Sequence, residues 1–294
     1  MKSLVALIKR EFIEHKGAFL YAPAIILAVL SVVMLSGVSF GRFSAVQQVG
    51  IISGAKGFEF GFLALSGLWF AYLLFALFFY FADAFSADSR NNSMLFWKSM
   101  PVSDFKMLAS KMTAGLTLFP ALIFGAALVS GVVVFVGTLI MVYTVPGFHL
   151  SDPVSYLATG ANIAGFSLGY LVLALLWYAP FFGWVGLLST LFRRWSIPLA
   201  FLVPGLVGLA ENLLLRDAGP DGGYVLSYLR RRADFEIDGD DLRLALFSDA
   251  PFDIATVLGR FVASIDWTQM VGGLVVAALF VYVASEVRRR AVAG

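Results

Sequence analysis

Cysteine is absent from this chain, and charged side chains make up only 14% of its 294 residues. Without cysteine there can be no disulfide, no thiolate nucleophile and no cysteine-based metal site. The two histidines, His15 and His149, lie too far apart in the sequence to suggest a histidine-rich metal site. Charged residues are about a quarter of a typical soluble domain. The low charge, with 60% hydrophobic residues and a mean hydropathy of +0.87, therefore predicts an integral membrane protein.

The best-known nucleotide- and zinc-binding signatures are missing as well. The sequence contains no phosphate-binding loop G-x-x-x-x-G-K-[ST] and no H-E-x-x-H. The acidic cluster Asp238, Asp240 and Asp241 lacks the ligand spacing of a calcium loop. A net charge of +2 is too small to indicate a nucleic-acid partner. We therefore expect no enzymatic activity, no cofactor, no metal site and no nucleic-acid binding in this chain.

Six apolar stretches are long enough to cross a bilayer core of about 30 Å as helices. They are residues 18–38, 60–81, 114–143, 166–191, 197–215 and 267–287. The fold class we predict is an all-α integral membrane protein with six transmembrane helices. Pro120 and Pro180 should kink their spans. Glu211, near the outer end of the fifth span, is interpreted as a carboxylate at the water boundary paired with Arg216, with a transport role as the alternative.

The N-terminal residues 1–17 have the pattern of a basic amphipathic helix. Their apolar residues recur at helical spacing, and their cations fall beside or opposite that stripe: Leu4, Val5, Ile8 and Phe12, against Lys2, Lys9, Arg10 and Lys16. Such a helix is expected along the membrane surface, and the alternative is a solvated helix end before the first span. Short cytoplasmic loops of membrane proteins are enriched in lysine and arginine. When both termini are placed in the cytoplasm, the short loops with most of the basic residues also fall on the cytoplasmic side, so we predict this orientation.

The outer loop, residues 216–266, is predicted to be a small ordered subdomain. Asp238-Gly239 lies between two strand-like runs, which favours a short hairpin. A helix should follow, because one apolar stripe recurs at i, i+3, i+4 and i+7: Ile254, Val257, Leu258, Phe261, Val262 and Ile265. Pro251 would occupy its first turn, with Ser248 or Asp249 as the cap, and the helix would rest on the outer leaflet or re-enter its edge.

Residues 84–112 interrupt the apolar runs with charges, amides, a tryptophan and a proline. We predict that the chain leaves the membrane after Asp83 through turn-forming serines and asparagines, and that residues 94–98 form an apolar-aromatic knob. Ser103 or Asp104 should cap a helix that runs into the third span. Exposed apolar patches rimmed by charge are typical of protein–protein sites. The alternative is that the knob packs on the N-terminal helix and is only structural.

Two blocks, LIKREFIEHKGAFLYAP and YFADAFSADSRNNSMLFWKSMPVSDFKMLASKM, resemble permease subunits of ATP-binding-cassette exporters of the second type. The similarity extends over the whole layout and depends mainly on FWKSMPVSD. It implies that residues 84–112 are the coupling segment that contacts a nucleotide-binding subunit, with a connecting helix at the N-terminus. The implied contact residues are Arg90, Asn91, Asn92, Ser93, Phe96, Trp97, Lys98 and Asp104, and Arg10, Glu11 and Glu14. Asn91-Asn92 stands where many members carry a second charge.

The resemblance implies an organisation of six segments: the connecting helix 1–17, spans 18–83, coupling segment 84–112, spans 113–215, outer loop 216–266, and the last span with a basic tail 267–294. It implies a permease in a bacterial plasma membrane that dimerises with itself or a paralogue and binds two ATPase subunits, where ATP and Mg would bind. Export of an amphipathic or hydrophobic peptide, lipid or drug is expected. The alternatives are an ion-coupled secondary transporter and a non-transporting scaffold or sensor.

Overall fold

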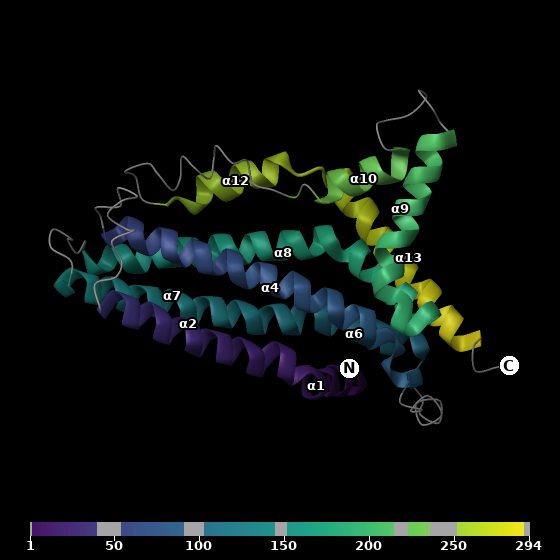
Figure 1. Cartoon of the computed structure of the whole chain (residues 1–294), viewed down its shortest axis with the longest axis horizontal. Helices are drawn as coiled ribbons and strands as arrows, with labels where there is room; N and C mark the ends of the chain where they lie inside the picture. Colours follow the sequence, from purple (N-terminus) through teal and green to yellow (C-terminus); the bar gives the residue numbers. More distant parts are fainter. Residues whose placement is uncertain are drawn as a thin grey trace.

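Every regular element in the described part of the chain is a helix. The computed structural model describes residues 2–39, 54–90, 103–144, 152–214, 223–233, 235 and 252–290. The elements in order are α1 (Lys2–Lys16), η1 (Gly17–Tyr21), α2 (Ala22–Ser39), α4 (Gly54–Arg90), α6 (Asp104–Thr113), η2 (Ala114–Leu118), α7 (Phe119–Thr144), α8 (Pro153–Phe192), η3 (Arg193–Trp195), α9 (Ser196–Leu214), α10 (Gly223–Ala233), α12 (Ile254–Ser264) and α13 (Trp267–Arg290). Figure 1 shows α2, α4, α7 and α8 running alongside one another.

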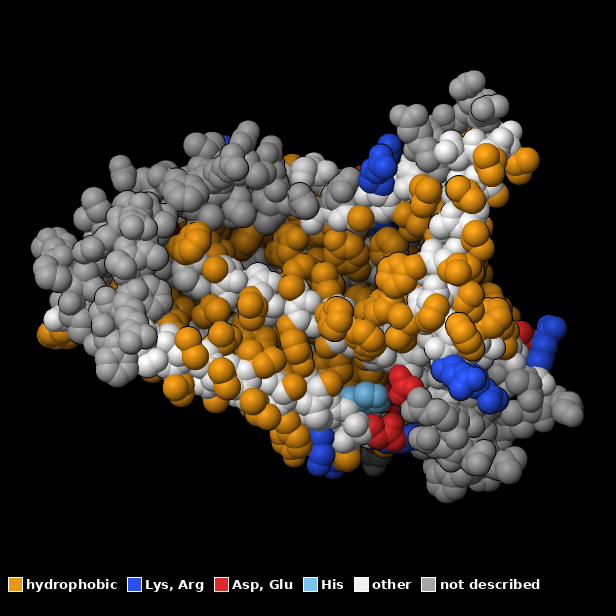
Figure 2. Space-filling model, in the orientation of Figure 1, with side chains coloured by type: hydrophobic (Ala, Val, Ile, Leu, Met, Phe, Trp, Pro, Cys, Tyr) orange, Lys and Arg blue, Asp and Glu red, His pale blue; other side chains and the backbone are white. Residues whose placement is uncertain are grey.

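Five helical runs of the described chain are long and apolar enough to cross a membrane. They are Leu4–Gly37, Gly54–Ala87, Asp104–Met141, Val154–Leu214 and Trp267–Arg290. Hydrophobic side chains cover most of the visible face between the ends of the bundle (Figure 2). Helices that face lipid have this distribution, because lipid tails are as apolar as the side chains and exposing them there costs no hydrophobic free energy. The prediction of an all-α fold with several apolar membrane-type helices is confirmed.

The fourth run contains a sharp break. Its 61 residues pass through η3, where Arg193 has a φ of 52°. Residues other than glycine rarely adopt a positive φ. The Arg193 amide still donates to the Ser189 carbonyl and closes the end of α8. The Ser196 hydroxyl then donates to the carbonyl of Ala82 at 3.2 Å, which attaches the start of α9 to α4. The run is therefore two helices that meet at η3.

Two π-helical turns each end two residues before a proline. η1 precedes Pro23, and η2 precedes Pro120. A proline cannot donate to the carbonyl four residues back, and its ring crowds that carbonyl. The wider turn lets the amides of Ala22 and Phe119 reach back five residues, to Gly17 and Ala114. The kink predicted at Pro120 thus falls directly after a π-turn. Pro180, where a kink was also predicted, lies inside α8.

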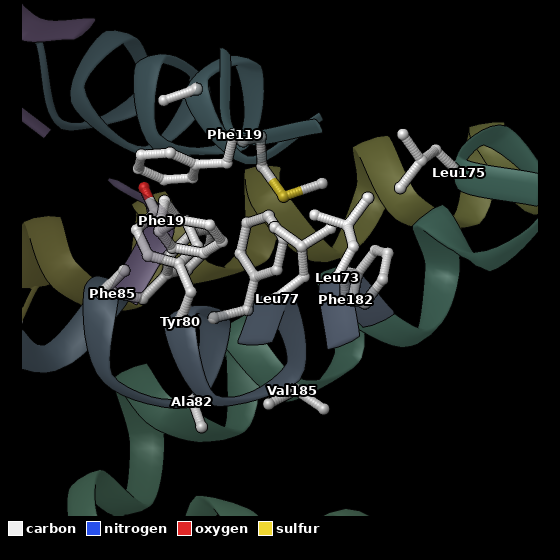
Figure 3. Close-up of a cluster of buried hydrophobic side chains, with 14 of the residues drawn as sticks. Phe19, Leu73, Leu77, Tyr80, Ala82, Phe85, Phe119, Leu175, Phe182 and Val185 are labelled. Atoms are coloured by element: carbon white, nitrogen blue, oxygen red, sulfur yellow. The ribbon is translucent and has the colours of Figure 1, made fainter. Parts of the chain in front are cut away.

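The main core is aromatic and joins α4, α7, α8 and the start of α2 (Figure 3). Phe19 lies within η1, and Phe119 directly follows η2. Their rings stack with centroids 3.9 Å apart. Glycine lets helices approach the larger rings, as where the Phe85 ring of α4 lies against Gly186 of α8. This packing fixes the end of α4 at which the site described below lies.

Helix α4 continues through Arg90, beyond the predicted exit of the chain at Asp83. The predicted turn is therefore wrong for residues 84–90, while the exit of the chain from the membrane after Asp83 stays a prediction. Serine favours a turn only when its hydroxyl bonds outside a helix, and the Ser86 hydroxyl instead donates to the carbonyl of Asp83 within α4. The coupling segment as predicted, 84–112, therefore begins with almost two further turns of helix.

The outer-loop helix is confirmed, but its start differs from the prediction. α12 begins at Ile254, and Asp253 is its N-cap, accepting from the amides of Ala255 and Thr256. A cap must directly precede the first turn, so Ser248 and Asp249 are too early. Val257 and Phe261 are buried, as the stripe predicted, and α12 packs on α8. The predicted hairpin at Asp238-Gly239 lies outside the described residues.

Candidate functional site

The buried face of α1 includes a carboxylate. Leu7 and Glu11 are only 7% and 2% exposed, whereas Val5, which the sequence placed on the apolar stripe, is 65% exposed. The stripe is thus rotated toward the side that carries Leu7 and Glu11. Figure 1 shows α1 near α6, and most contacts of α1 are with α6, η1 and η2. α1 also continues into η1 and α2 without an interruption.

Glu11 forms an ion pair with Lys111 of α6. The Lys111 Nζ lies 2.8 Å from Glu11 Oε1, and the two side chains are 1% and 3% exposed. The hydroxyl of Tyr80, from α4, lies 2.9 Å from Glu11 Oε2 and 3.2 Å from the carbonyl oxygen of Lys111. It has one proton to donate, so it can serve only one of these acceptors at a time. Three helices meet at this cluster, which we call the Glu11 junction.

His15 closes the Glu11 junction on one side. Its Nδ1 lies 3.1 Å from the carbonyl oxygen of Glu11, one helical turn earlier, and 3.8 Å from Glu11 Oε2. Its ring meets the Tyr80 ring edge-on with centroids 4.8 Å apart. Glu11, Glu14 and His15 are close enough together to consider as metal ligands. Both carboxylates are engaged by cations, however, because Arg10 Nε lies 2.6 Å from Glu14, and this favours ion pairs over a metal site.

A second ion pair attaches the start of α6 to the end of α13. Ser103 caps α6 by accepting from the Lys106 amide, so of the two predicted caps Ser103 is the one used. Asp104 lies in the first turn, where a negative charge is favourable. Its Oδ1 accepts from Arg288 Nε at 3.1 Å, and the Arg288 side chain is only 4% exposed. An Arg288 Nη2 also lies 3.0 Å from the sulfur of Met107.

The predicted contact residues thus have different environments. Asp104 and Glu11 are engaged within the chain, while Arg10 and Glu14 pair on the partly exposed side of α1. Arg90 is the last residue of α4, and the predicted residues between it and α6 lie outside the described residues: Asn91, Asn92, Ser93, Phe96, Trp97 and Lys98.

Sequence reasoning missed Lys111, Tyr80 and Arg288 as partners in this site. A signal for Glu11 was present, because Leu4, Leu7 or Ile8, Glu11 and His15 follow helical spacing and place the carboxylate on an apolar face. An acid on such a face needs a cation, but nothing local identifies Lys111, 100 residues later.

A further buried cation lies at the other end of α13, against its first turn. Arg232 of α10 is fully buried, and it donates to the carbonyl oxygens of Trp177 and Gln269 and to the Tyr228 hydroxyl. Its guanidinium lies 4.6 Å from the centre of the Trp177 ring, within cation–π distance. Glu211 accepts from the Val225 amide at 2.8 Å and thereby caps α10. The interpretation of Glu211 as a boundary carboxylate stays a prediction, because its expected partner Arg216 is outside the described residues.

Comparisons with protein-family models, with curated proteins and with solved structures find no match for this chain.

Proposed function

We propose that this chain is the permease subunit of an ATP-driven exporter, coupled through α1 and the segment that precedes α6 to a separate nucleotide-binding subunit. The observation that carries the proposal is the Glu11 junction. It ties α1 to α6 and α4 by buried charged hydrogen bonds. Both α1 and α6 continue directly into long apolar helices. A force applied to residues 91–102 would therefore move α1, α4 and α6 together.

The proposed topology has six spans with both termini in the cytoplasm of a bacterium. α1 and the end of α13 both contact α6, so the two ends of the chain lie on one side of the bundle (Figure 1). Termini on the same side require an even number of crossings. Dividing Val154–Leu214 at Arg193 turns the five apolar runs into six and satisfies that requirement.

A second permease subunit, identical or paralogous, belongs to the proposal. α9 carries large apolar side chains that its own chain leaves exposed, including Phe201 at 69%, Leu213 at 72% and Leu214 at 82%. In a membrane, lipid or another helix covers such a face. In the proposed assembly two ATPase subunits bind ATP and Mg, and this chain itself performs no hydrolysis.

An ion-coupled transporter is the second candidate, because two buried carboxylates adjoin apolar helices. Besides Glu11, Glu59 of α4 is 1% exposed. Each already has a lysine partner, and Glu59 pairs with Lys56 at 2.7 Å while it accepts from the Phe252 amide. A carboxylate that binds a transported ion must release its partner in the cycle, which a paired lysine opposes. This is why we prefer the ATP-driven function.

Efflux measured in cells distinguishes the candidates. Cells that express the chain with its native neighbours are loaded with a fluorescent amphiphile, and efflux is followed after ATP depletion or after addition of an ionophore. ATP-driven export predicts that efflux stops on ATP depletion and continues with the ionophore present while ATP is maintained. The opposite pattern would favour the ion-coupled transporter, and no efflux in either condition would favour a scaffold or sensor.

A further inference from the structure

A cavity of about 480 Å³ lies between α4, α7 and α8, and among the described residues no charged side chain lines it. Its walls are formed mostly by aliphatic and phenyl groups, such as Leu63, Ile123 and Phe124. The volume falls within the range of sites that hold small molecules. It lies within the apolar part of the bundle, away from the Glu11 junction.

Two of the polar groups in the lining are satisfied by the protein itself. Trp69 Nε1 donates to the Ser130 hydroxyl at 2.8 Å, and the Tyr170 hydroxyl donates to the carbonyl of Phe235 at 3.1 Å. Both side chains thus present their apolar faces to the cavity.

Two hydroxyls in the lining have no such partner. Ser66 of α4 and Ser167 of α8 make no hydrogen bond with any described residue. The Ser66 oxygen is fully buried, so it can reach a ligand in the cavity only after a change of its rotamer. Several other helical hydroxyls bond to their own helix, as Ser130 does to Ala126 and Thr138 to Val134, whereas Ser189, which does not line the cavity, is also without a partner among the described residues. A buried hydroxyl without a partner costs free energy, which a ligand with a hydrogen-bonding group would recover.

We infer that the cavity binds the acyl chain of an uncharged acyl ester or amide, whose carbonyl accepts a hydrogen bond from Ser167, or from Ser66 after a change of its rotamer. The apolar walls suit the hydrocarbon, and the absence of charge in the lining disfavours an ionised group there. The acyl group can come from a resident membrane lipid or from an exchangeable amphiphile. The inference goes beyond the exporter proposal and stands separately, because it needs no ATPase subunit.

Gly67 provides a direct way to close the cavity. It lines the wall, and a Cβ built at this position meets no atom within 4 Å. Gly67→Leu should therefore place its side chain in the cavity without displacing a neighbour. Gly125 of α7 is equally open, with nothing within 4 Å of a Cβ, and it does not line the cavity. Gly125→Leu is the matched control, since it makes the same chemical change elsewhere in the bundle.

The test measures binding of a dansyl-labelled undecanoyl amide to the purified full chain in detergent, by fluorescence titration. We expect Gly67→Leu to weaken binding at least ~10-fold, because it removes the volume that the chain occupies. Gly125→Leu should bind like the wild type. Ser66→Ala and Ser167→Ala should together weaken the amide roughly 5-fold and leave a dansyl-labelled alkane unchanged, since only the amide has a carbonyl to accept their protons.

Lipid extraction and mass spectrometry of the same samples separate the two sources. A resident lipid predicts that the wild type and Gly125→Leu retain about one acyl lipid per chain after delipidation and that Gly67→Leu loses it. An exchangeable amphiphile predicts no retained lipid and binding of the probe as above. The inference is overturned if Gly67→Leu matches Gly125→Leu in both probe affinity and retained lipid, with all variants equally monodisperse and helical.

Discussion

The Nζ of Lys111 lies 2.8 Å from Oε1 of Glu11, and each side chain is almost fully shielded from solvent. The two residues are 100 positions apart in the sequence, and they join α1 to α6. Burying two charges is favourable only when each finds good hydrogen-bond partners, and here Tyr80 adds one at Glu11 Oε2. The two residues therefore depend on one another.

Removing one partner should destabilise the fold far more than removing both. Glu11→Ala leaves the Lys111 ammonium buried without its carboxylate, which we expect to cost about 3–5 kcal/mol. The double variant Glu11→Leu, Lys111→Met replaces the pair by apolar side chains and should lie close to the wild type. The measurement is unfolding of the purified chain in detergent, followed by circular dichroism. Arg10→Ala, which breaks the partly exposed pair with Glu14, should cost under about 1 kcal/mol.

A double variant as unstable as Glu11→Ala alone would contradict the pairing. Equal costs for Glu11→Ala and Arg10→Ala would show that the burial of Glu11 is wrong.

The arginines at the end of α13 should differ sharply. Arg288 is 4% exposed and bonds to Asp104, while Arg290 is 79% exposed and pairs with Glu286 one turn earlier. Arg288→Ala should destabilise the chain by about 2–3 kcal/mol, because a hydrogen-bonded charge is lost from a buried position. Arg290→Ala should change stability by less than about 1 kcal/mol. The same unfolding assay decides this, and similar costs for the two variants would count against the α6–α13 contact.

Two adjacent glycines in α13 give a test of the Arg232 site. A Cβ at Gly273 would collide with the Arg232 guanidinium, whereas a Cβ at Gly272 meets nothing within 4 Å. Gly273→Ala should therefore displace Arg232 and lower stability by roughly 1–3 kcal/mol, the usual cost of overpacking. Gly272→Ala should be neutral or stabilising, since alanine favours helix by about 1 kcal/mol. The melting temperature should fall for Gly273→Ala and stay level or rise for Gly272→Ala; an equal fall in both would contradict the site.

The cap of α12 should make its stability sensitive to acid. Hydrogen bonds from the Thr256 hydroxyl and the Ala255 amide hold the pKa of Asp253 below its ordinary value of 3.8. A lowered pKa means that the folded state favours the carboxylate. The stabilisation is therefore present above pH 3.8 and is lost as the pH falls through the lower pKa of the folded state. The wild type should melt above Asp253→Ala at pH 6, with the gap narrowing toward pH 3. A constant gap would contradict the cap.

Local patterns were enough to predict much of the fold. The apolar runs, the stripe of α12 and the serine cap of α6 depend on residues within a few turns of one another, so spacing and composition reveal them. The burial of Glu11 could not be predicted in the same way, because its partners Tyr80 and Lys111 come from two other helices. The continuation of α4 past Asp83 was also missed, since a serine can bond equally to its own helix or to a turn.

The central claim is that residues 91–102 and α1 connect this chain to an ATPase. It is tested most directly by purifying the full chain from its native membrane and measuring ATP hydrolysis in the eluate. The wild type should bring down a subunit with a phosphate-binding loop and hydrolyse ATP. The double variant Trp97→Ala, Lys98→Glu should lose that subunit or hydrolyse ATP without transport. A wild-type eluate without ATPase, or a double variant that matches the wild type in both subunit content and transport, would contradict the claim.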